Sequence, residues 1–265
     1  KNSFFILLCL RLIQVGAANS QSKGSCTTSM GKSVLITGGN RGLGKALVET
    51  FSKAGWTVLA TARRAESIAE LDNVTRYQLD LSQQTQIDAL ADHLKDTPID
   101  VIIHNAGFNP KDQKDKPGYF ESTFYVKDFV ATNVAESMMI NALYPMELTG
   151  KLLSNLSKDG IVIAISSWLG SIGKKNFAGH YGYAGSKALM NMCMKGLSLE
   201  FAKDETTQRT AIALNPGWMK TDMGGQNAEL TPEEVASRIL GMIEDGFFAE
   251  NNGKFLNTDR TEHEW

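Results

Sequence analysis

Short apolar runs alternate with longer amphipathic stretches along the chain from about position 33 onward. Runs of this kind predict strands, and each interval between them is long enough for one helix, which is typical of βαβ units. Some runs, such as Ile161 to Ile165, are apolar without interruption, as expected of strands that helices cover on both faces. The pattern predicts an α/β fold: a doubly wound parallel β-sheet with helices on both faces, in a single domain.

The individual elements follow from the same pattern. We expect strands near Ser33 to Thr37, Thr57 to Thr61, Thr75 to Leu79, Ile99 to His104, Gly160 to Ser166, Thr210 to Leu214 and Lys254 to Leu256. We expect helices to begin near Gly42, Ala65, Gln83, Val126, Tyr181 and Thr231. The stretch from Phe108 to Gly118, in which Lys and Asp surround two prolines, predicts one exposed loop.

The first 29 residues follow a different pattern. An apolar run from Phe4 to Leu10 is interrupted by Arg11, and Ser20 to Ser29 is polar. A secretory signal and a non-native or upstream extension both remain open, and the run is too short to span a bilayer. Because Met30 stands just before the first strand, we expect an N-terminal extension over residues 1–29, disordered or non-native, and a folded domain over 30–265.

Composition narrows the possible partners. Hydrophobic residues make up 42% of the chain and charged residues 21%, with a net charge of -2, which is ordinary for a globular protein. Neither nucleic acid nor a membrane surface is expected as a partner, because there is no overall basic field. Of the three cysteines, only Cys193 lies outside the N-terminal segment, so we expect a reducing, cytoplasmic location. The histidines His93, His104 and His180 lack metal-ligand spacing and are interpreted as structural.

A glycine-rich segment, Thr37-Gly-Gly-Asn-Arg-Gly-Leu-Gly44, connects the first predicted strand to the first helix. Glycines allow a tight turn and close approach of the backbone, and a helix N-terminus offers free N–H groups to a pyrophosphate. A glycine cluster alone is weak evidence, but its position between a strand and a helix strengthens it. The predicted dinucleotide contacts are Gly38, Asn40, Arg41, Gly42, Leu43 and Gly44.

The spacing GxxxGxG resembles that of the short-chain dehydrogenase/reductase family, and the resemblance covers nearly all of residues 31–265. Further motifs of the family follow later strands: Asp80-Leu81, Asn105-Ala106-Gly107 and Pro216-Gly217. The resemblance implies a Rossmann fold, with Asp80 and Leu81 near the adenine and Thr221 at the nicotinamide carboxamide. It also implies that Asn105, Ala106, Gly107, Pro216 and Gly217 line the cofactor cleft.

The cofactor is predicted to be NADP(H). An acidic residue at the end of the second strand would accept a hydrogen bond from the ribose of NAD, but Arg63 and Arg64 stand there instead. Together with Arg41 in the glycine segment, Arg63 suits the 2'-phosphate of NADP, because guanidinium pairs with phosphate in a bidentate fashion. The alternative is that Arg63 and Arg64 are solvated surface charges.

Tyr183 and Lys187 are the predicted catalytic pair. Their spacing places both on one face of a helix, at the position where the family has its catalytic Tyr and Lys. The Lys187 ammonium is expected to lower the pKa of the phenol, and the resemblance implies that both residues also bind the cofactor. Tyr181 is excluded, because Gly185 stands four residues after it.

The resemblance implies two further catalytic residues. The motif Ile165-Ser-Ser-Trp-Leu-Gly170 identifies Ser167 as the serine that binds the substrate oxygen. Its distance of 16 residues from Tyr183 is longer than usual, because Lys174 to Gly179 is an added loop, so Ser171 remains the alternative. The asparagine of a proton relay is Asn141 rather than Asn133, since Pro145 follows Asn141 by four residues.

These residues predict an NADPH-dependent oxidoreductase, a carbonyl reductase or alcohol dehydrogenase that transfers hydride between nicotinamide and a carbonyl or hydroxyl group of a small molecule. The segment after Ser167 and the C-terminal stretch resemble the carbonyl reductase branch that includes sniffer and C-factor proteins. A cofactor-sensing or C-factor-like signalling protein is the alternative. The helix from Tyr183 to Phe201 resembles the one that the family uses to assemble, which implies a homodimer or homotetramer.

Overall fold

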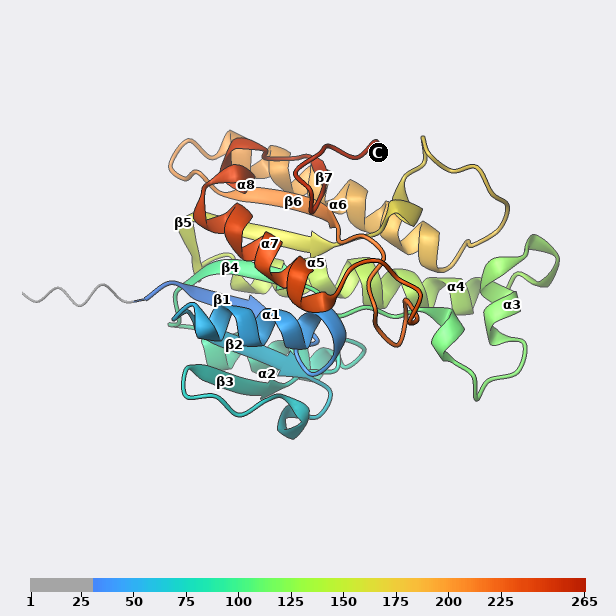
Figure 1. Ribbon diagram of the computed structural model, residues 1–265, viewed down its shortest axis with the longest axis horizontal. Helices are drawn as coiled ribbons and strands as arrows, with labels where there is room; N and C mark the ends of the chain where they lie inside the picture. Colours follow the sequence, from blue (N-terminus) through green and yellow to red (C-terminus); the bar gives the residue numbers. More distant parts are fainter. Residues whose placement is uncertain (1–30) are drawn as a thin grey trace, which may run out of the picture. The chain divides into compact units, whose positions relative to one another are not determined.

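The computed structural model describes residues 31–265, which contain a seven-stranded sheet in the order β3-β2-β1-β4-β5-β6-β7 (Figure 1). Every neighbouring pair of strands is parallel. The strands are β1 (Ser33–Ile36), β2 (Thr57–Ala62), β3 (Val74–Gln78), β4 (Ile99–His104), β5 (Leu156–Ile165), β6 (Thr210–Asn215) and β7 (Phe255–Asn257). The predicted parallel sheet is confirmed, and β5 is longer at its start than the apolar run suggested.

Helices cover both faces of the sheet, which confirms the doubly wound, single-domain fold. The longer helices are α1 (Gly42–Lys53), α2 (Gln84–Leu94), α4 (Ala131–Met138), α5 (Tyr144–Leu152), α6 (Tyr183–Lys203) and α7 (Pro232–Glu244), and the short ones are α3 (Tyr119–Phe124) and α8 (Phe247–Glu250). One buried cluster joins α1, α7 and α8 to the sheet, and a second joins α2, α5 and α6 to its other face. The apolar strand positions are therefore buried on both sides.

Two predicted helices differ from the structure. Near Ala65 there is only a single 3-10 turn, Ala65–Ser67, because Ile68 alone in that stretch is buried and an α-helix would have no apolar face to pack. Near Val126 there is another 3-10 turn, and α4 starts at Ala131. The loop from 108 to 118 is mostly exposed as predicted, although it contains a 3-10 turn and is followed by the unpredicted α3.

The strand order places the cofactor motifs together. β1 lies between β2 and β4, so the connections after β1 and β4 leave the same edge of the sheet in opposite directions. This point is the usual ligand crevice of open parallel sheets, at the carboxyl ends of the strands. The glycine segment follows β1, Asn105 follows β4, and Ser167 follows β5, so all three reach this crevice.

The predicted extension over residues 1–29 lies outside the described residues. Within residues 31–265, no helix combines the length and apolar character needed to cross a membrane.

Acidification is expected to destabilise the protein through His104, which is buried at the end of β4 and bonded by Nε2 to Thr149 Oγ1 at 2.7 Å. Burial lowers the pKa of His104 from 6.5 to about 4. The unfolded chain therefore binds a proton at His104 below about pH 6.5, whereas the folded chain binds it only below about pH 4. The free energy of unfolding falls as the pH is lowered through that window. Chemical unfolding at pH 7 and at pH 4.5 should differ by roughly 2 to 3 kcal/mol from this residue alone.

The matched control is His104→Gln, which keeps an amide donor for Thr149 but has no titrating group. Its free energy of unfolding should fall less between the two pH values than that of the wild type. An equal fall in both proteins would show that other groups cause the acid sensitivity.

Candidate active site

The glycine segment after β1 is a turn that only glycines permit. Gly38 and Gly42 have positive φ angles of 70° and 51°, which are strained for other residues. A Cβ at Gly44 would overlap the carbonyl oxygen of Gly38, so the first turn of α1 packs directly against the loop. Leu43 is buried beneath it and Asn40 is partly exposed. The predicted segment thus forms a close-packed backbone cradle.

The motif after β4 braces this cradle. Asn105 Nδ2 donates to the carbonyl oxygens of Thr37 and Gly38, at 3.0 and 3.1 Å. Thr37 Oγ1 accepts hydrogen bonds from the backbone N–H groups of Asn105 and Ala106. Asn105 therefore holds the loop in shape, a positioning role that its place in the sequence motif alone did not specify.

The cradle fits the phosphates of a dinucleotide. The first N–H groups of a helix have no partner within the helix, and at α1 the N-cap residue Arg41 makes no side-chain capping bond to them. A helix N-terminus of this kind attracts anions. The residues suited to hold a pyrophosphate are those around Gly38 to Gly44.

Two arginines lie at the edge of this cradle. Arg63 is exposed directly after β2, the strand that pairs with β1. Arg41 pairs with Asp222, with Nη1 and Oδ2 at 3.3 Å, and both side chains are largely exposed. Asp222 comes from the loop between β6 and α7, and sequence reasoning did not anticipate that it would partner Arg41. A phosphate that binds Arg41 would compete with this exposed ion pair.

The remaining predicted cofactor contacts lie in the loops after β3 and β6. Asp80 follows β3, where its Oδ1 accepts hydrogen bonds from Ser82, and Leu81 is buried. Pro216 and Gly217 follow β6, and Gly217 has a φ of 83°. Thr221 lies against Gly42: a Cβ added to that glycine would meet Thr221 Cγ2 at 3.4 Å. The loop after β6 therefore reaches across to the start of α1.

The pair Tyr183 and Lys187 lies on the first turns of α6, which begins at Tyr183 rather than at Tyr181. The Nζ of Lys187 lies 5.7 Å from the centroid of the Tyr183 ring and donates to the carbonyl oxygen of Ile165 at 2.7 Å. Lys187 is buried, whereas Tyr183 remains partly exposed. The end of β5 thus fixes the lysine while the phenol reaches the crevice.

The expected lowering of the Tyr183 pKa by Lys187 is wrong, because the structure raises this pKa. Burial raises the pKa of Tyr183 to about 12, the Ser167 side chain opposes this rise, and the charge of Asp112 adds to it. Burial also lowers the pKa of Lys187 to about 8. Desolvation disfavours the charged form of each residue, and Lys187 is not among the groups that shift the pKa of Tyr183. Near neutral pH, Tyr183 is therefore protonated and able to donate a proton.

The three serines after β5 make different hydrogen bonds. Ser166 Oγ turns away and donates to Asn191 Oδ1 at 2.6 Å. Ser167 caps a 3-10 turn by accepting from the Leu169 N–H at 3.2 Å, and its hydroxyl affects Tyr183 as described. Ser171, the alternative, is buried and donates to the carbonyl oxygen of Trp265. The geometry associates Ser167 with Tyr183 and places Ser171 in a contact with the C-terminal segment.

Asn141 lies in a π-helical turn, Met139–Leu143, between α4 and α5. Its amide exchanges two hydrogen bonds with the backbone of Phe108, at 2.6 and 2.8 Å, and donates a third to Ser186. Asn141 Oδ1 and Lys187 Nζ both lie within 4 Å of the point that a Cβ at Gly107 would occupy. Asn133, by contrast, donates to Ser122 in α3. Asn141 is thus the asparagine that the fold brings beside Lys187.

Sequence reasoning missed Met223, which lies in the same loop as Asp222. Its Sδ is 4.0 Å from the hydroxyl of Tyr183. Trp218, at the start of that loop, is 53% exposed and donates from Nε1 to Gly224 O. Spacing in the sequence carried no signal for this contact, because a long loop brings Met223 to the tyrosine. Met223 therefore lies beside the Tyr183 hydroxyl at the crevice.

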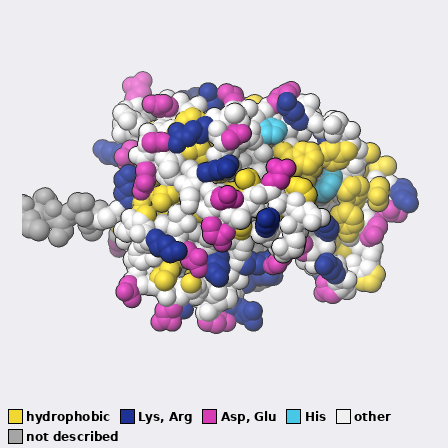
Figure 2. All heavy atoms as spheres, viewed as in Figure 1, with side chains coloured by type: hydrophobic (Ala, Val, Ile, Leu, Met, Phe, Trp, Pro, Cys, Tyr) yellow, Lys and Arg dark blue, Asp and Glu magenta, His cyan; other side chains and the backbone are white. Residues whose placement is uncertain are grey.

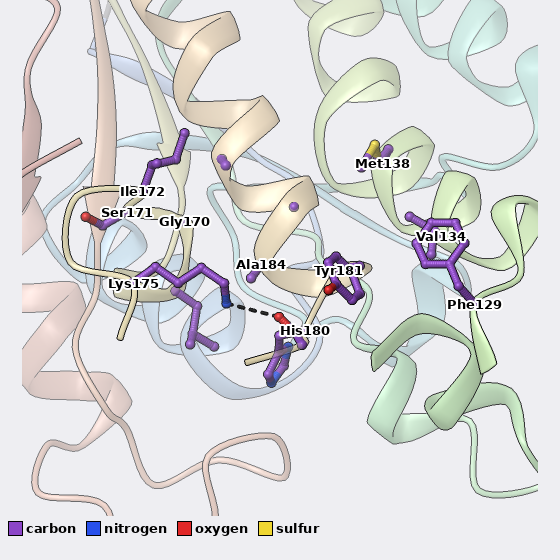
Figure 3. Close-up of a pocket in the computed structure, with 14 residues that line it drawn as sticks. Phe129, Val134, Met138, Gly170, Ser171, Ile172, Lys175, His180, Tyr181 and Ala184 are labelled. Carbon is purple, nitrogen blue, oxygen red and sulfur yellow. Dashed lines mark hydrogen bonds between the residues drawn. The ribbon is translucent and has the colours of Figure 1, made fainter. Parts of the chain in front are cut away.

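An apolar hollow of about 310 Å³ lies between α4, the loop after β5 and the start of α6 (Figure 3). Phe129, Val134 and Met138 line it from one side, and Ile172 and Tyr181 from others. Apolar side chains also gather on the surface around α3 and α4 (Figure 2). His180 lines the hollow, next to Lys175, whose Nζ donates to Gly179 O at 3.0 Å.

Comparison with known proteins agrees with this geometry. A sequence model of the short chain dehydrogenase family matches residues 32–231. The chain belongs to the short-chain dehydrogenase family. It is 30% identical over 179 residues to the C-signal of Myxococcus xanthus, covering 67% of this chain and 99% of that protein.

Two solved structures are similar over most of the chain. The carbonyl reductase Sniffer of D. melanogaster superposes with a TM-score of 0.77 at 27% identity, covering 89% of this chain and 100% of the other. A carbonyl reductase from Pseudomonas aeruginosa PAO1 in complex with NADP has a TM-score of 0.72 at 28% identity, with 89% and 100% covered. The protein is therefore an oxidoreductase of the short-chain dehydrogenase/reductase family, and its structure is similar to those of these two carbonyl reductases.

Proposed function

We propose that this short-chain dehydrogenase/reductase is an NADPH-dependent carbonyl reductase that interconverts a small-molecule carbonyl compound and its alcohol. One observation carries the proposal: a protonated, partly exposed phenol at Tyr183 is influenced by Ser167 and lies beside buried Lys187, at the sheet edge that holds the glycine cradle. A proton donor next to a dinucleotide crevice suits the reduction of a carbonyl group.

The catalytic roles follow from this arrangement. The nicotinamide, when bound, supplies a hydride to the carbonyl carbon. Tyr183 donates its proton to the oxygen, which would otherwise carry a negative charge, and the Ser167 hydroxyl orients that oxygen. Lys187 supplies positive charge near Tyr183 and holds the nicotinamide ribose. Asn141 fixes the backbone at Phe108 and stands beside Lys187, where it can support a proton relay.

The preference for NADPH rests on charge. Arg41 is the N-cap residue of α1 and Arg63 directly follows β2, where the adenosine ribose of a dinucleotide is expected, and both are exposed. Guanidinium groups favour a phosphate at this point, and no acidic side chain follows β2 to accept from a ribose hydroxyl. NADP-bound relatives of similar structure support the same choice.

The proposal extends to assembly and location. Met192 and Leu199 lie on the side of α6 opposite to Tyr183 and Lys187, and they are 69% and 54% exposed. Large exposed apolar side chains on one helix favour self-association, so we propose a homodimer or homotetramer. A cytoplasmic location is proposed on the cysteine content.

The proposed function is tested by following NADPH absorbance with a panel of aldehydes, ketones, dicarbonyls and quinones. The expected result is turnover of part of the panel with NADPH in preference to NADH. Tight NADPH binding without turnover of any carbonyl compound would refute the enzyme and favour a cofactor-sensing protein.

A further inference from the structure

His180 stands three residues before Tyr183 in an unusual backbone conformation. Its φ angle is 70°, and among residues 31–265 the only other non-glycine residue with a positive φ is Arg260. A strained residue persists only where its surroundings hold it in place, and such residues cluster at functional sites. The sequence suggested only a structural role for His180, and that role does not explain its positive φ angle.

The backbone of His180 is held from two directions. Its N–H donates to the carbonyl oxygen of Phe124 at 3.0 Å, and its own carbonyl oxygen accepts from the Ala184 N–H at 3.1 Å. The first bond joins it to the end of α3, and the second joins it to the first turn of α6. The backbone at His180 is thus fixed relative to the first turn of α6, which contains Tyr183.

The ring is also held by aromatic neighbours. Its centroid lies 4.6 Å from that of Phe124, 6.1 Å from Phe177 and 6.3 Å from Tyr183. Lys175 in turn lies over Phe177, with Nζ 3.8 Å from the ring centroid. The imidazole therefore forms part of a wall that ends at the catalytic phenol.

The nitrogen atoms of the His180 ring make no hydrogen bond to any other group in the part of the chain that the structure describes. His93, His104 and His263 each engage a ring nitrogen in a hydrogen bond, whereas neither nitrogen of His180 has a hydrogen-bond partner within residues 31–265. The pKa of His180 is lowered, mainly by burial and then by the charges of Lys175 and Lys111. A neutral imidazole offers one N–H donor and one acceptor nitrogen.

We propose that His180 is a specificity-determining residue that hydrogen-bonds a second oxygen of the substrate, while Tyr183 and Ser167 bind the reacting carbonyl oxygen. The proposal rests on the function proposed above. It favours flat carbonyl compounds with a second oxygen, such as aryl diketones and hydroxyketones, over matched compounds with one carbonyl. Hydride adds to one carbonyl carbon, the Tyr183 proton goes to its oxygen, and the second oxygen stays unchanged.

A purely packing role for His180 makes a different prediction. If the ring served only to fill space against Phe124 and Phe177, phenylalanine would replace it well and asparagine would not. If its nitrogens bind substrate, asparagine replaces it better, because Asn keeps a donor and an acceptor and tolerates positive φ. The two variants therefore rank in opposite order under the two roles.

The test compares 1-phenylpropane-1,2-dione with propiophenone, which lacks the second oxygen. For wild type, His180→Phe and His180→Asn, the ratio of kcat/KM for the dione to that for the ketone is measured with NADPH. The dissociation constants of both compounds for the NADP⁺ complex are measured by tryptophan fluorescence. Thermal melts check that each variant folds, and Tyr181→Phe, which changes the exposed neighbour, is the control.

We expect His180→Phe to lower the dione-to-ketone ratio about tenfold, the loss typical of one hydrogen bond, and His180→Asn to keep most of it. The control should retain the ratio. A ratio kept by His180→Phe and lost by His180→Asn would overturn the proposal in favour of packing. If His180→Phe does not fold, the binding preference of wild type compared with His180→Asn and an alanine variant decides.

Failure of the proposed function can be distinguished from failure of the proposal for His180. If wild type reduces neither compound, the carbonyl reductase proposal fails, and the dissociation constants still decide the role of His180. A dione affinity weakened about tenfold in His180→Phe, with ketone affinity unchanged, supports the second-oxygen site. Equal affinities of wild type and His180→Phe for the dione overturn it.

Discussion

Replacing Tyr183 by phenylalanine is expected to lower kcat for carbonyl reduction by about 10²- to 10⁴-fold. The change removes the only atom of that side chain able to give a proton to the developing alkoxide, and it leaves the ring, with its contact to His180, in place. The affinity for NADPH should fall by no more than about tenfold, the loss typical of one hydrogen bond to the ribose. Steady-state kinetics and cofactor titration check both parts.

Tyr181→Phe provides the matched control for this experiment. Tyr181 lies just before α6 and is 40% exposed, so loss of its hydroxyl should leave kcat unchanged. Thermal melts of both variants should match that of the wild type. A Tyr183→Phe protein that reduces the substrate at the wild-type rate would assign the proton transfer to another group.

Removing the guanidinium groups of Arg41 and Arg63 should weaken the enzyme's preference for NADPH over NADH. We expect the double variant Arg41→Ala, Arg63→Ala to raise KM for NADPH by about 10- to 100-fold, because charge-assisted hydrogen bonds contribute about 1.5 to 3 kcal/mol. KM for NADH should change much less, because NADH has no 2'-phosphate for these residues to bind. The ratio of kcat/KM for the two cofactors, measured at fixed ionic strength, is the readout.

Asp222→Asn tests the same site in the opposite direction. Arg41 pairs with Asp222 across the crevice, and an exposed pair of this kind contributes about 0.2 to 1 kcal/mol. Releasing Arg41 should therefore tighten NADPH binding by up to about fivefold, with no comparable gain for NADH. Equal effects on the two cofactors in either variant would mean that the arginines do not recognise the 2'-phosphate.

The parallel sheet could be predicted because its strands carry their burial in their own sequence. Ile161 to Ile165 is apolar throughout, and the structure buries it between helix layers. The glycine segment could also be recognised from the sequence, since the close packing of Gly44 on Gly38 permits no other residue type. In both cases the local sequence preference and the tertiary packing favour the same structure.

Predictions failed where a segment's conformation depends on what packs against it. The stretch after Arg64 has helix-forming residues but buries only Ile68, and the chain forms a single turn there. The sequence also carried no sign that Asp222 and Met223 reach the crevice, because contacts of a long loop have no spacing rule. The pKa of Tyr183 depended on burial, a property of the assembled site, and so the expected direction was wrong.

The π-helical turn at Met139–Leu143 has an evolutionary consequence. Such a turn contains one residue more than the α-helical turn that it replaces. Deleting one residue there would restore regular helix and rotate the downstream side chains by about 100°, which follows from 3.6 residues per turn. Asn141 would then leave Phe108 and Lys187 while the helix itself survived. A one-residue deletion thus separates a helix that only packs from one that holds a buried amide near Lys187.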